Sequence, residues 1–123
     1  MVIADTNIFI ATIRGNEIAE ALLLKHQNSL AISLITILEL KSGATDSKKK
    51  TAVRLITDMY TVLPLSKHIG ERALQLVELY TTPQRKLEVP DALIAATCLE
   101  HQASLLTFNT KDFKFIKGLK FAK

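Results

Sequence analysis

The chain opens with Val2-Ile3-Ala4-Asp5-Thr6-Asn7, a short apolar run that ends abruptly in a carboxylate. Three consecutive apolar residues at this point predict a buried strand, and from Asn7 onward the apolar residues recur at helical spacing. The rest of the sequence repeats this order of a short apolar run followed by a helical stretch. Further strands are expected at residues 30–32, 61–65, 104–107 and 119–122.

Helical patterns separate these apolar runs. We expect helices over residues 16–26, from the cap Ser33 to Gly43, over residues 45–60, from the cap Ser66 to Tyr80, and from Pro90 through Ala96. Pro64 places its strand near a sheet edge, because proline has no N–H to donate. Strands that alternate with helices predict an α/β layered fold with a mostly parallel sheet of four or five short strands.

Length and composition indicate one domain over residues 1–123, with 48% apolar and 23% charged residues. The one cysteine, Cys98, has no partner for an internal disulfide, and we expect it to be a buried and unreactive thiol. The sequence lacks the run of about 18 apolar residues that a membrane span needs. Asp5 also interrupts any signal-peptide pattern at the start. These features lead us to expect a cytoplasmic protein.

The charges are unevenly distributed along the chain. Lysine and arginine total 16 against 12 acids, a net charge of +4. The tail from Lys111 to Lys123 has five lysines and one aspartate, so its net charge equals that of the whole chain. Lys48-Lys49-Lys50 form a second basic cluster. A basic surface favours an anionic partner, although solvated surface lysines are the default explanation for both clusters.

Four of the 12 acids lie where a carboxylate is costly unless it is paired, hydrogen-bonded or bound to a metal. They are Asp5 at a strand end, Glu39 within an apolar helix, Asp91 at the start of another apolar helix, and Asp112 just beyond the strand at 104–107.

Each of these acids also has a local explanation. Asp5 and Asp112 can form hydrogen bonds within turns. Glu39 can complete a capping box with Thr36 if the helix begins there, although Ser33 is the better-placed cap. Asp91 can simply favour a helix N-terminus. Taken singly, none of the four acids requires a functional role.

Taken together, the four acids indicate a metal site. In parallel α/β sheets, ligand sites form beyond the carboxyl ends of the strands, where such positions converge. Clustered carboxylates repel one another, and a hard divalent cation such as Mg²⁺ or Mn²⁺ is their natural counter-charge. Zinc is not expected, because His26, His68 and His101 are scattered over helical positions.

Four motifs, in order along nearly the whole chain, resemble the PIN-domain ribonucleases, and most closely the VapC-type toxins of bacterial toxin–antitoxin pairs. The motifs are Asp5-Thr6-Asn7 after the first strand, Thr36-Ile37-Leu38-Glu39-Leu40, Pro90-Asp91-Ala92-Leu93-Ile94-Ala95-Ala96, and Leu105-Leu106-Thr107-Phe108-Asn109-Thr110-Lys111-Asp112-Phe113. Phe108 departs from the pattern, because such toxins often have a basic residue there. An RNA contact from that position is therefore not expected.

The resemblance implies a three-layer PIN-like fold and a metal-dependent endoribonuclease acting on structured RNA, often transfer or ribosomal RNA. It also implies an acidic quartet that holds one or two Mg²⁺ or Mn²⁺ ions, and four polar groups that support it. The quartet is Asp5, Glu39, Asp91 and Asp112, and the supporting groups are Thr6, Asn7, Thr107 and Asn109.

The same resemblance implies two protein partners, a small inhibitory antitoxin and a second copy of the chain. Apolar positions on the helices at 18–24 and 51–60 are candidate surfaces for them.

Two other functions remain open from the residues. The first is a metal-dependent phosphohydrolase that uses Asp5 as nucleophile, although such enzymes usually have a second aspartate where this chain has Asn7. The second is a non-catalytic RNA-binding module, which would have no need of four acids.

Overall fold

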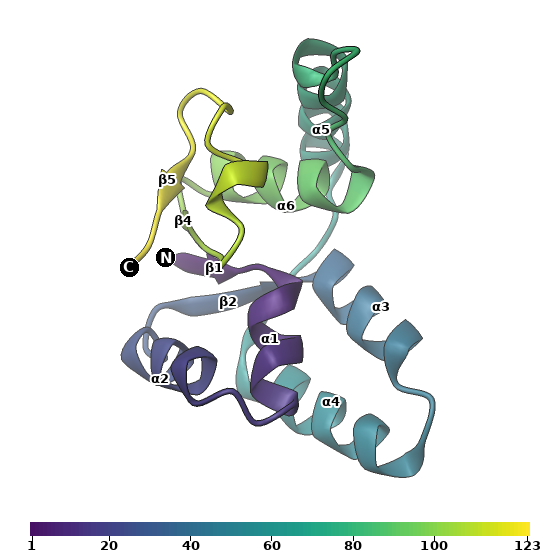
Figure 1. Ribbon diagram of the computed structural model, residues 1–123, viewed down its shortest axis with the longest axis vertical. Coiled ribbons are helices and arrows are strands. Elements are labelled where there is room, and N and C mark those ends of the chain that lie inside the picture. Colours follow the sequence, from purple (N-terminus) through teal and green to yellow (C-terminus); the bar gives the residue numbers. More distant parts are fainter.

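The computed structural model describes residues 1–123 and contains one five-stranded sheet in the order β3-β2-β1-β4-β5 (Figure 1). Every neighbouring pair of strands is parallel. The strands are β1 (Val2–Ala4), β2 (Leu30–Ser33), β3 (Thr61–Leu63), β4 (Ser104–Leu106) and β5 (Lys120–Phe121). The helices are α1 (Thr6–Ile13), α2 (Glu17–Lys25), α3 (Leu34–Gly43), α4 (Ser47–Met59), α5 (Lys67–Tyr80), α6 (Val89–Glu100) and the short 3₁₀ helix η1 (Thr110–Asp112).

The predicted α/β class and parallel sheet are confirmed, with small shifts at the element ends. β3 is an edge strand, as Pro64 predicts, and it ends at Leu63 rather than at residue 65. α6 is longer than expected, because its apolar pattern continues past Ala96 to Glu100. β4 ends at Leu106, so Thr107 is the first residue beyond the sheet.

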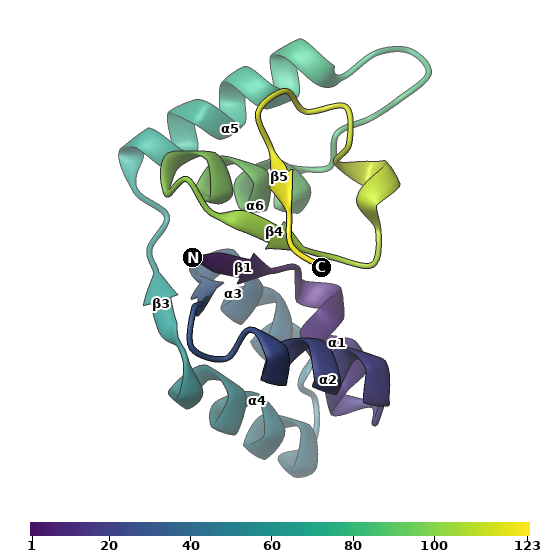
Figure 2. The same cartoon turned by 90° about the vertical axis from the view of Figure 1, so that its left-hand side faces the viewer.

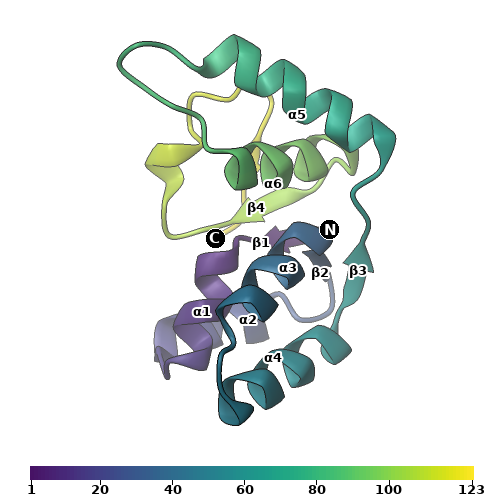
Figure 3. The ribbon, with the colours of Figure 1, turned by 90° about the vertical axis from the view of Figure 1, so that its right-hand side faces the viewer.

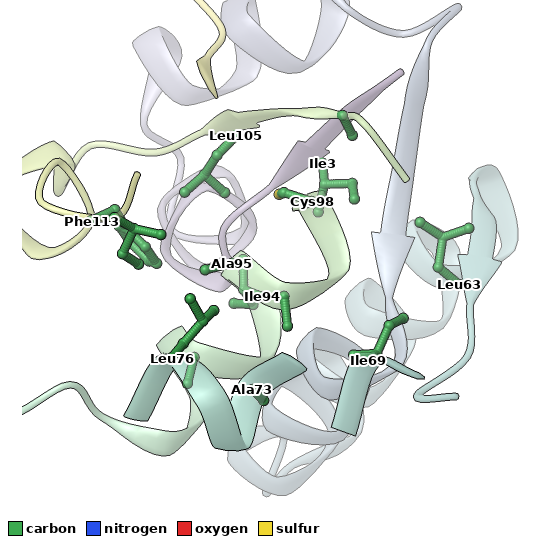
Figure 4. Close-up of a cluster of buried hydrophobic side chains, with 14 of the residues drawn as sticks. Ile3, Leu63, Ile69, Ala73, Leu76, Ile94, Ala95, Cys98, Leu105 and Phe113 are labelled. Atoms are coloured by element: carbon green, nitrogen blue, oxygen red, sulfur yellow. The ribbon is translucent and has the colours of Figure 1, made fainter. Parts of the chain in front are cut away.

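Side chains alternate across the sheet and bury both of its faces. Ile3 and Leu105 pack with α5 and α6 in one buried cluster (Figure 4). Val2, Ala4 and Leu106 point the other way, into a second cluster that includes residues of α1 to α4. Figures 2 and 3 show the resulting three layers, with α5 and α6 on one side of the strands and α1, α2 and α4 on the other. The three-layer expectation is therefore also confirmed.

Polar side chains begin most of these helices, as their N-cap positions require. The side chains of Asn16, Ser33 and Ser66 accept backbone N–H bonds at the starts of α2, α3 and α5. Because α3 begins at Leu34 after Ser33, the capping-box explanation of Glu39 is wrong. Asp46 caps α4, accepting the N–H of Lys49 at 2.8 Å, which the sequence analysis missed.

The order of the strands creates a switch point between β1 and β4. The chain runs from β1 outward to β2 and β3, and then returns to place β4 on the other side of β1. Segments that leave the carboxyl ends of β1 and β4 therefore diverge, and such a switch point is where open α/β sheets bind ligands. None of the helices combines the length and apolar character needed to cross a membrane.

Candidate active site

Asp5 and Thr107 meet across the switch point. Asp5 directly follows β1 and is only 4% exposed. Its Oδ2 accepts the hydroxyl proton of Thr107 at 2.9 Å, while Thr107 Oγ1 accepts the N–H of Asn109 at 3.0 Å. The Asn109 amide therefore orients the Thr107 hydroxyl so that its proton points at the carboxylate.

Burial raises the pKa of Asp5 above its usual range, and the charges of Glu39 and Asp112 act in the same direction. Hydrogen bonds from Thr107 and from the backbone of Thr6 act against this shift without cancelling it. Asp5 is thus a desolvated carboxylate with other acids nearby, which is an unfavourable state for an anion without a cation.

Thr6, Thr36 and Glu39 form a second hydrogen-bonded chain. Thr6 donates to Glu39 Oε1 at 2.7 Å, and its oxygen lies 3.0 Å from that of Thr36. A hydroxyl has one proton, and the carboxylate can only accept. Thr36 must therefore donate to Thr6, which donates to Glu39. Both threonines are buried, so this chain fixes one oxygen of Glu39 and links α1 to α3.

Asp91 and Asp112 complete the acidic group from the other side. Asp91 lies in the first turn of α6 and is partly buried, whereas Asp112 ends η1 and is exposed. Neither carboxylate has a hydrogen-bond partner in the protein. The main-chain N–H of Asp112 does bond the carbonyl of Asn109 at 2.9 Å, so the expected turn exists without involving the Asp112 side chain.

The pKa of Asp91 is raised to about 6, first by burial and then by the charges of Asp5, Asp112 and Glu39. Asp91 therefore lies within electrostatic range of the other three predicted acids. None of them takes part in an ion pair, because the four salt bridges use Asp46, Glu71, Glu88 and Glu100. The structure thus brings together the four acids that the sequence singled out and provides no basic partner for them.

The supporting polar residues divide into two kinds. Thr6 and Thr107 bond acids directly. Asn7 is exposed, and together with Asn109 and Phe108 it lines a surface hollow between α1 and the segment after β4. Sequence reasoning considered Thr36 only as a capping residue. Its position one turn before Glu39 on an apolar helix was the available signal for a role beside that carboxylate.

The donor set matches the chemistry of Mg²⁺ or Mn²⁺, which prefer carboxylate and other oxygen ligands. No three of the acids converge closely enough to share one ion as they stand. Asp91 and Asp112 have no side-chain hydrogen bonds to break, so rotation of these two side chains is the least costly way to close the group. The residues therefore fit a divalent ion in kind, and an ion bound by three or more of these acids would require their side chains to move closer together.

The remaining nucleophile and imidazoles lie away from this chemistry. Cys98 is fully buried, and burial together with the charge of Asp5 raises its pKa to about 12, as expected for an unreactive thiol. His26 and His101 follow the ends of α2 and α6, and His68 is exposed near the start of α5. The group of acids is therefore supported by hydroxyl and amide groups alone.

Residues 2–119 match the PIN domain family. The chain belongs to this family. Ribonuclease VapC1 of Rickettsia felis is 34% identical over 127 residues, covering 96% of this chain and 92% of that protein. Ribonuclease VapC10 of Mycobacterium tuberculosis is 29% identical over 122 residues, covering 98% of this chain and 91% of that protein.

A chain in a solved toxin–antitoxin complex from Klebsiella pneumoniae is similar in structure. It matches with a TM-score of 0.83 and 34% identity, covering 97% of this chain and 95% of that chain. The resemblance drawn from the four sequence motifs is therefore confirmed, and this PIN domain is of the VapC type.

Proposed function

We propose that the protein is a Mg²⁺- or Mn²⁺-dependent endoribonuclease, formed by a single PIN domain over residues 1–123, and the toxin of a toxin–antitoxin pair. The observation that carries the proposal is the group of four carboxylates at the β1–β4 switch point, which has no basic partner. The VapC relatives are named ribonucleases, which supports RNA as the substrate.

Asp5, Glu39, Asp91 and Asp112 would hold one or two divalent ions. When bound, such an ion stabilises charge on the scissile phosphate and lowers the pKa of an attacking water. Thr107 donates to Oδ2 of Asp5, and Thr6 donates to Oε1 of Glu39. Asp5 Oδ1 and Glu39 Oε2 receive no side-chain hydrogen bond and would be the oxygens that ligate an ion. The two threonines thereby hold these acids in place before any ligand arrives.

Asn7 and Asn109 supply amide groups at the rim of the same region. Both line the surface hollow between α1 and the segment after β4. Asn7 follows Asp5 by two residues and Asn109 follows Thr107 by two, so a side-chain amide there can donate to a phosphate or hold an ordered water. Phe108 lies there too and is 45% exposed. It cannot supply the ionic RNA contact that a basic residue would make, but its exposed ring can stack on an unpaired base, a contact that the sequence analysis did not expect. This arrangement suits cleavage in a loop of a structured RNA, such as a transfer or ribosomal RNA.

The basic tail supplies an attractive surface for the phosphate backbone. Its lysines are all exposed and form no ion pair. They are Lys111, Lys114, Lys117, Lys120 and Lys123. If the four site acids are occupied by cations, the exterior is more basic than the net charge of +4 suggests. Exposed lysines would attract the RNA backbone, and the site acids would hold the ions needed for cleavage.

An antitoxin and a second copy of the chain are the proposed protein partners, in the cytoplasm. The similar Klebsiella structure is a toxin–antitoxin complex. Ile18 and Leu24 on α2 and Leu55 and Met59 on α4 are each more than half exposed. Apolar side chains this exposed are candidate contacts for both partners.

Cleavage of RNA by the purified protein, with MnCl₂ or with EDTA, tests this function. We expect cleavage in Mn²⁺, none in EDTA, and recovery when excess Mn²⁺ is added. Asp5→Asn should lower the rate about 1,000-fold, since it removes a charge from the ion's ligand set. The matched control Asp58→Asn removes an exposed, unpaired acid of α4 and should cut like the wild type.

Other outcomes select the alternatives. Cleavage that survives both EDTA and Asp5→Asn rejects the metal mechanism. RNA that is bound but never cut, in any metal, indicates a non-catalytic binding module. A trapped phosphoryl group on Asp5 indicates a phosphohydrolase instead.

A further inference from the structure

Arg85 lies at the centre of a cluster that joins two separate segments of the chain. The loop between α5 and α6 is closed by two main-chain hydrogen bonds between Thr82 and Arg85, at 2.7 and 3.1 Å. Within this loop, Arg85 Nε donates to the carbonyl of Tyr80 at 3.1 Å. Its guanidinium carbon lies 3.9 Å from the centre of the Phe115 ring.

Tyr80 makes the same connection from the end of α5. Its ring packs against Phe115, with centroids 5.5 Å apart and the planes inclined at 55°. Its hydroxyl oxygen accepts the main-chain N–H of Lys117 at 3.0 Å. These contacts therefore hold the segment after η1 against the α5–α6 loop. We call the three residues that make them, Arg85, Tyr80 and Phe115, the Arg85 clamp. Figures 2 and 3 both place these two segments at the same end of the molecule.

The clamp joins the two segments that carry Asp91 and Asp112, the acids without side-chain hydrogen bonds. The α5–α6 loop leads directly into α6 and Asp91, and Phe115 follows closely after Asp112. Neither carboxylate forms a side-chain hydrogen bond. Their separation therefore depends on how the two segments are held together.

Arg85 has no competing electrostatic role, because it is absent from every ion pair, and nearby Glu88 pairs with Lys86 at 3.8 Å. A guanidinium that lies over a ring while its Nε donates to a carbonyl makes two contacts at once, a geometry that lysine cannot reproduce. The side chain is thus committed to Phe115 and Tyr80 rather than to a carboxylate.

We propose that Arg85 is a positioning residue, which holds the segments of Asp91 and Asp112 at the spacing that divalent-ion binding requires. The proposal rests on the proposed function, but its first test does not. Arg85 acts through Phe115 and Tyr80 and does not touch the ion or the RNA.

Hydrogen exchange of the full chain, without metal or RNA, tests the clamp itself. In Arg85→Ala, amides over residues 110–117 should exchange about tenfold faster, because these bonds open with their segment. Arg72→Ala is the matched control. It removes another α5–α6 arginine contact, the 2.9 Å pair with Glu100, and should leave 110–117 unchanged. Unchanged exchange in Arg85→Ala overturns the proposal, whatever the protein cleaves.

Calorimetric titration with MnCl₂ alone tests the positioning role. Arg85→Ala removes a cation–π contact and one hydrogen bond, and we expect it to weaken Mn²⁺ binding about fivefold. Arg85→Lys should recover part of this affinity. The control Arg72→Ala should bind Mn²⁺ like the wild type. Phe115→Leu should weaken binding similarly, and the double variant should lose less than the sum of the two single losses, because the Arg85–Phe115 contact is removed only once.

The outcomes separate the two proposals. A wild type that does not bind Mn²⁺ contradicts the proposed function, and the exchange experiment then decides whether the clamp exists. Additive losses in the double variant, or faster exchange with unchanged Mn²⁺ affinity, overturn the positioning role while leaving the proposed function standing.

Discussion

The four acids fall into two pairs that differ in how they are held. The inner pair, Asp5 and Glu39, lies at the end of β1 and within α3, and each member accepts a threonine hydroxyl bond. The outer pair, Asp91 and Asp112, lies at the start of α6 and on η1, without side-chain bonds. The inner pair is fixed by the fold, whereas the outer pair is positioned only by the segments that carry it.

This difference shows how a site can keep four carboxylates in order before a cation binds. Holding four repelling carboxylates rigidly together would strain the fold. Fixing two and leaving two free to rotate defines where an ion binds while the outer pair relieves the repulsion. The pKa of Asp91 is raised first by burial and then by the charges of the other three acids, so some of this repulsion remains.

The largest effect should come from removing the Thr6 hydroxyl, which holds Glu39 of the inner pair. Thr6→Val keeps the shape but leaves Glu39 without its donor, so we expect the Mn²⁺ concentration for half-maximal cleavage to rise about 10- to 100-fold. Thr6→Ser keeps the hydroxyl and should stay close to the wild type. Both values come from cleavage rates measured across a Mn²⁺ series.

Thr36→Val separates orientation from stability. It removes the buried donor to Thr6 but keeps the Thr6–Glu39 bond. We expect a loss of about 1–3 kcal/mol in the free energy of unfolding with little change in the Mn²⁺ requirement. If Thr36→Val and Thr6→Val raise that requirement equally, the hydroxyl bond does not orient Glu39 and the distinction between the pairs fails.

A smaller effect, of opposite sign, is expected for the outer pair. Asp91→Asn removes a repelled charge, so in EDTA at pH 8 the variant should be more stable than the wild type by about 1 kcal/mol, or about 4 °C in Tm, after allowing for solvent at this half-buried carboxylate. Excess Mn²⁺ should reverse the order, because only the wild type keeps the full ligand set. Thermal melts in both conditions measure this.

The pH dependence of this difference has a defined direction. The pKa of Asp91 is about 6 in the folded protein, against a usual value of 3.8. Between these values the folded state binds more protons, so the contribution of Asp91 to stability falls as pH rises from about 4 to about 6. The advantage of Asp91→Asn should therefore vanish near pH 4. An advantage that persists there would have a cause other than the Asp91 charge.

Sequence predicted what depends on local pattern. Short apolar runs identified all the strands, and Pro64 correctly indicated an edge. The acids stood out because of their places in the pattern. Asp5 ends an apolar strand, Glu39 and Asp91 lie within and at the start of apolar helices, and Asp112 follows the strand at 104–107. These signals are local because the buried face of a strand or helix sets the spacing of apolar residues along a short stretch of sequence.

Contacts between distant segments were not accessible in the same way. The bond from Thr107 to Asp5 joins residues at opposite ends of the chain, and its partners are known only once β4 lies beside β1. Three further features depend on the position of a partner that the local pattern does not specify. Thr36 needs the Thr6 hydroxyl, the Asp46 cap needs the main-chain amide of Lys49, and the Arg85 clamp needs the Phe115 ring. The sequence therefore predicted the acids but not the groups that hold them.

The smallest effect concerns the lysines beside the outer pair. Lys111 and Lys114 flank Asp112 and are exposed. We expect these two lysines to neutralise phosphates of an RNA that reaches the outer pair. In Lys111→Ala/Lys114→Ala we expect RNA binding in EDTA to weaken roughly fivefold, and the slope of log K against log salt to fall by about 1.4–1.8. Fluorescence anisotropy over a salt series measures both.

The control Lys25→Ala/Lys67→Ala removes the same charge from α2 and α5, away from η1. If only the total charge matters, the two double variants should lose affinity equally, and the outer pair would have no special place in RNA binding. If only the first variant changes the slope, RNA approaches from the side of Asp91 and Asp112. The freely rotating pair would then be the one that meets the substrate, and the fixed pair the one behind it.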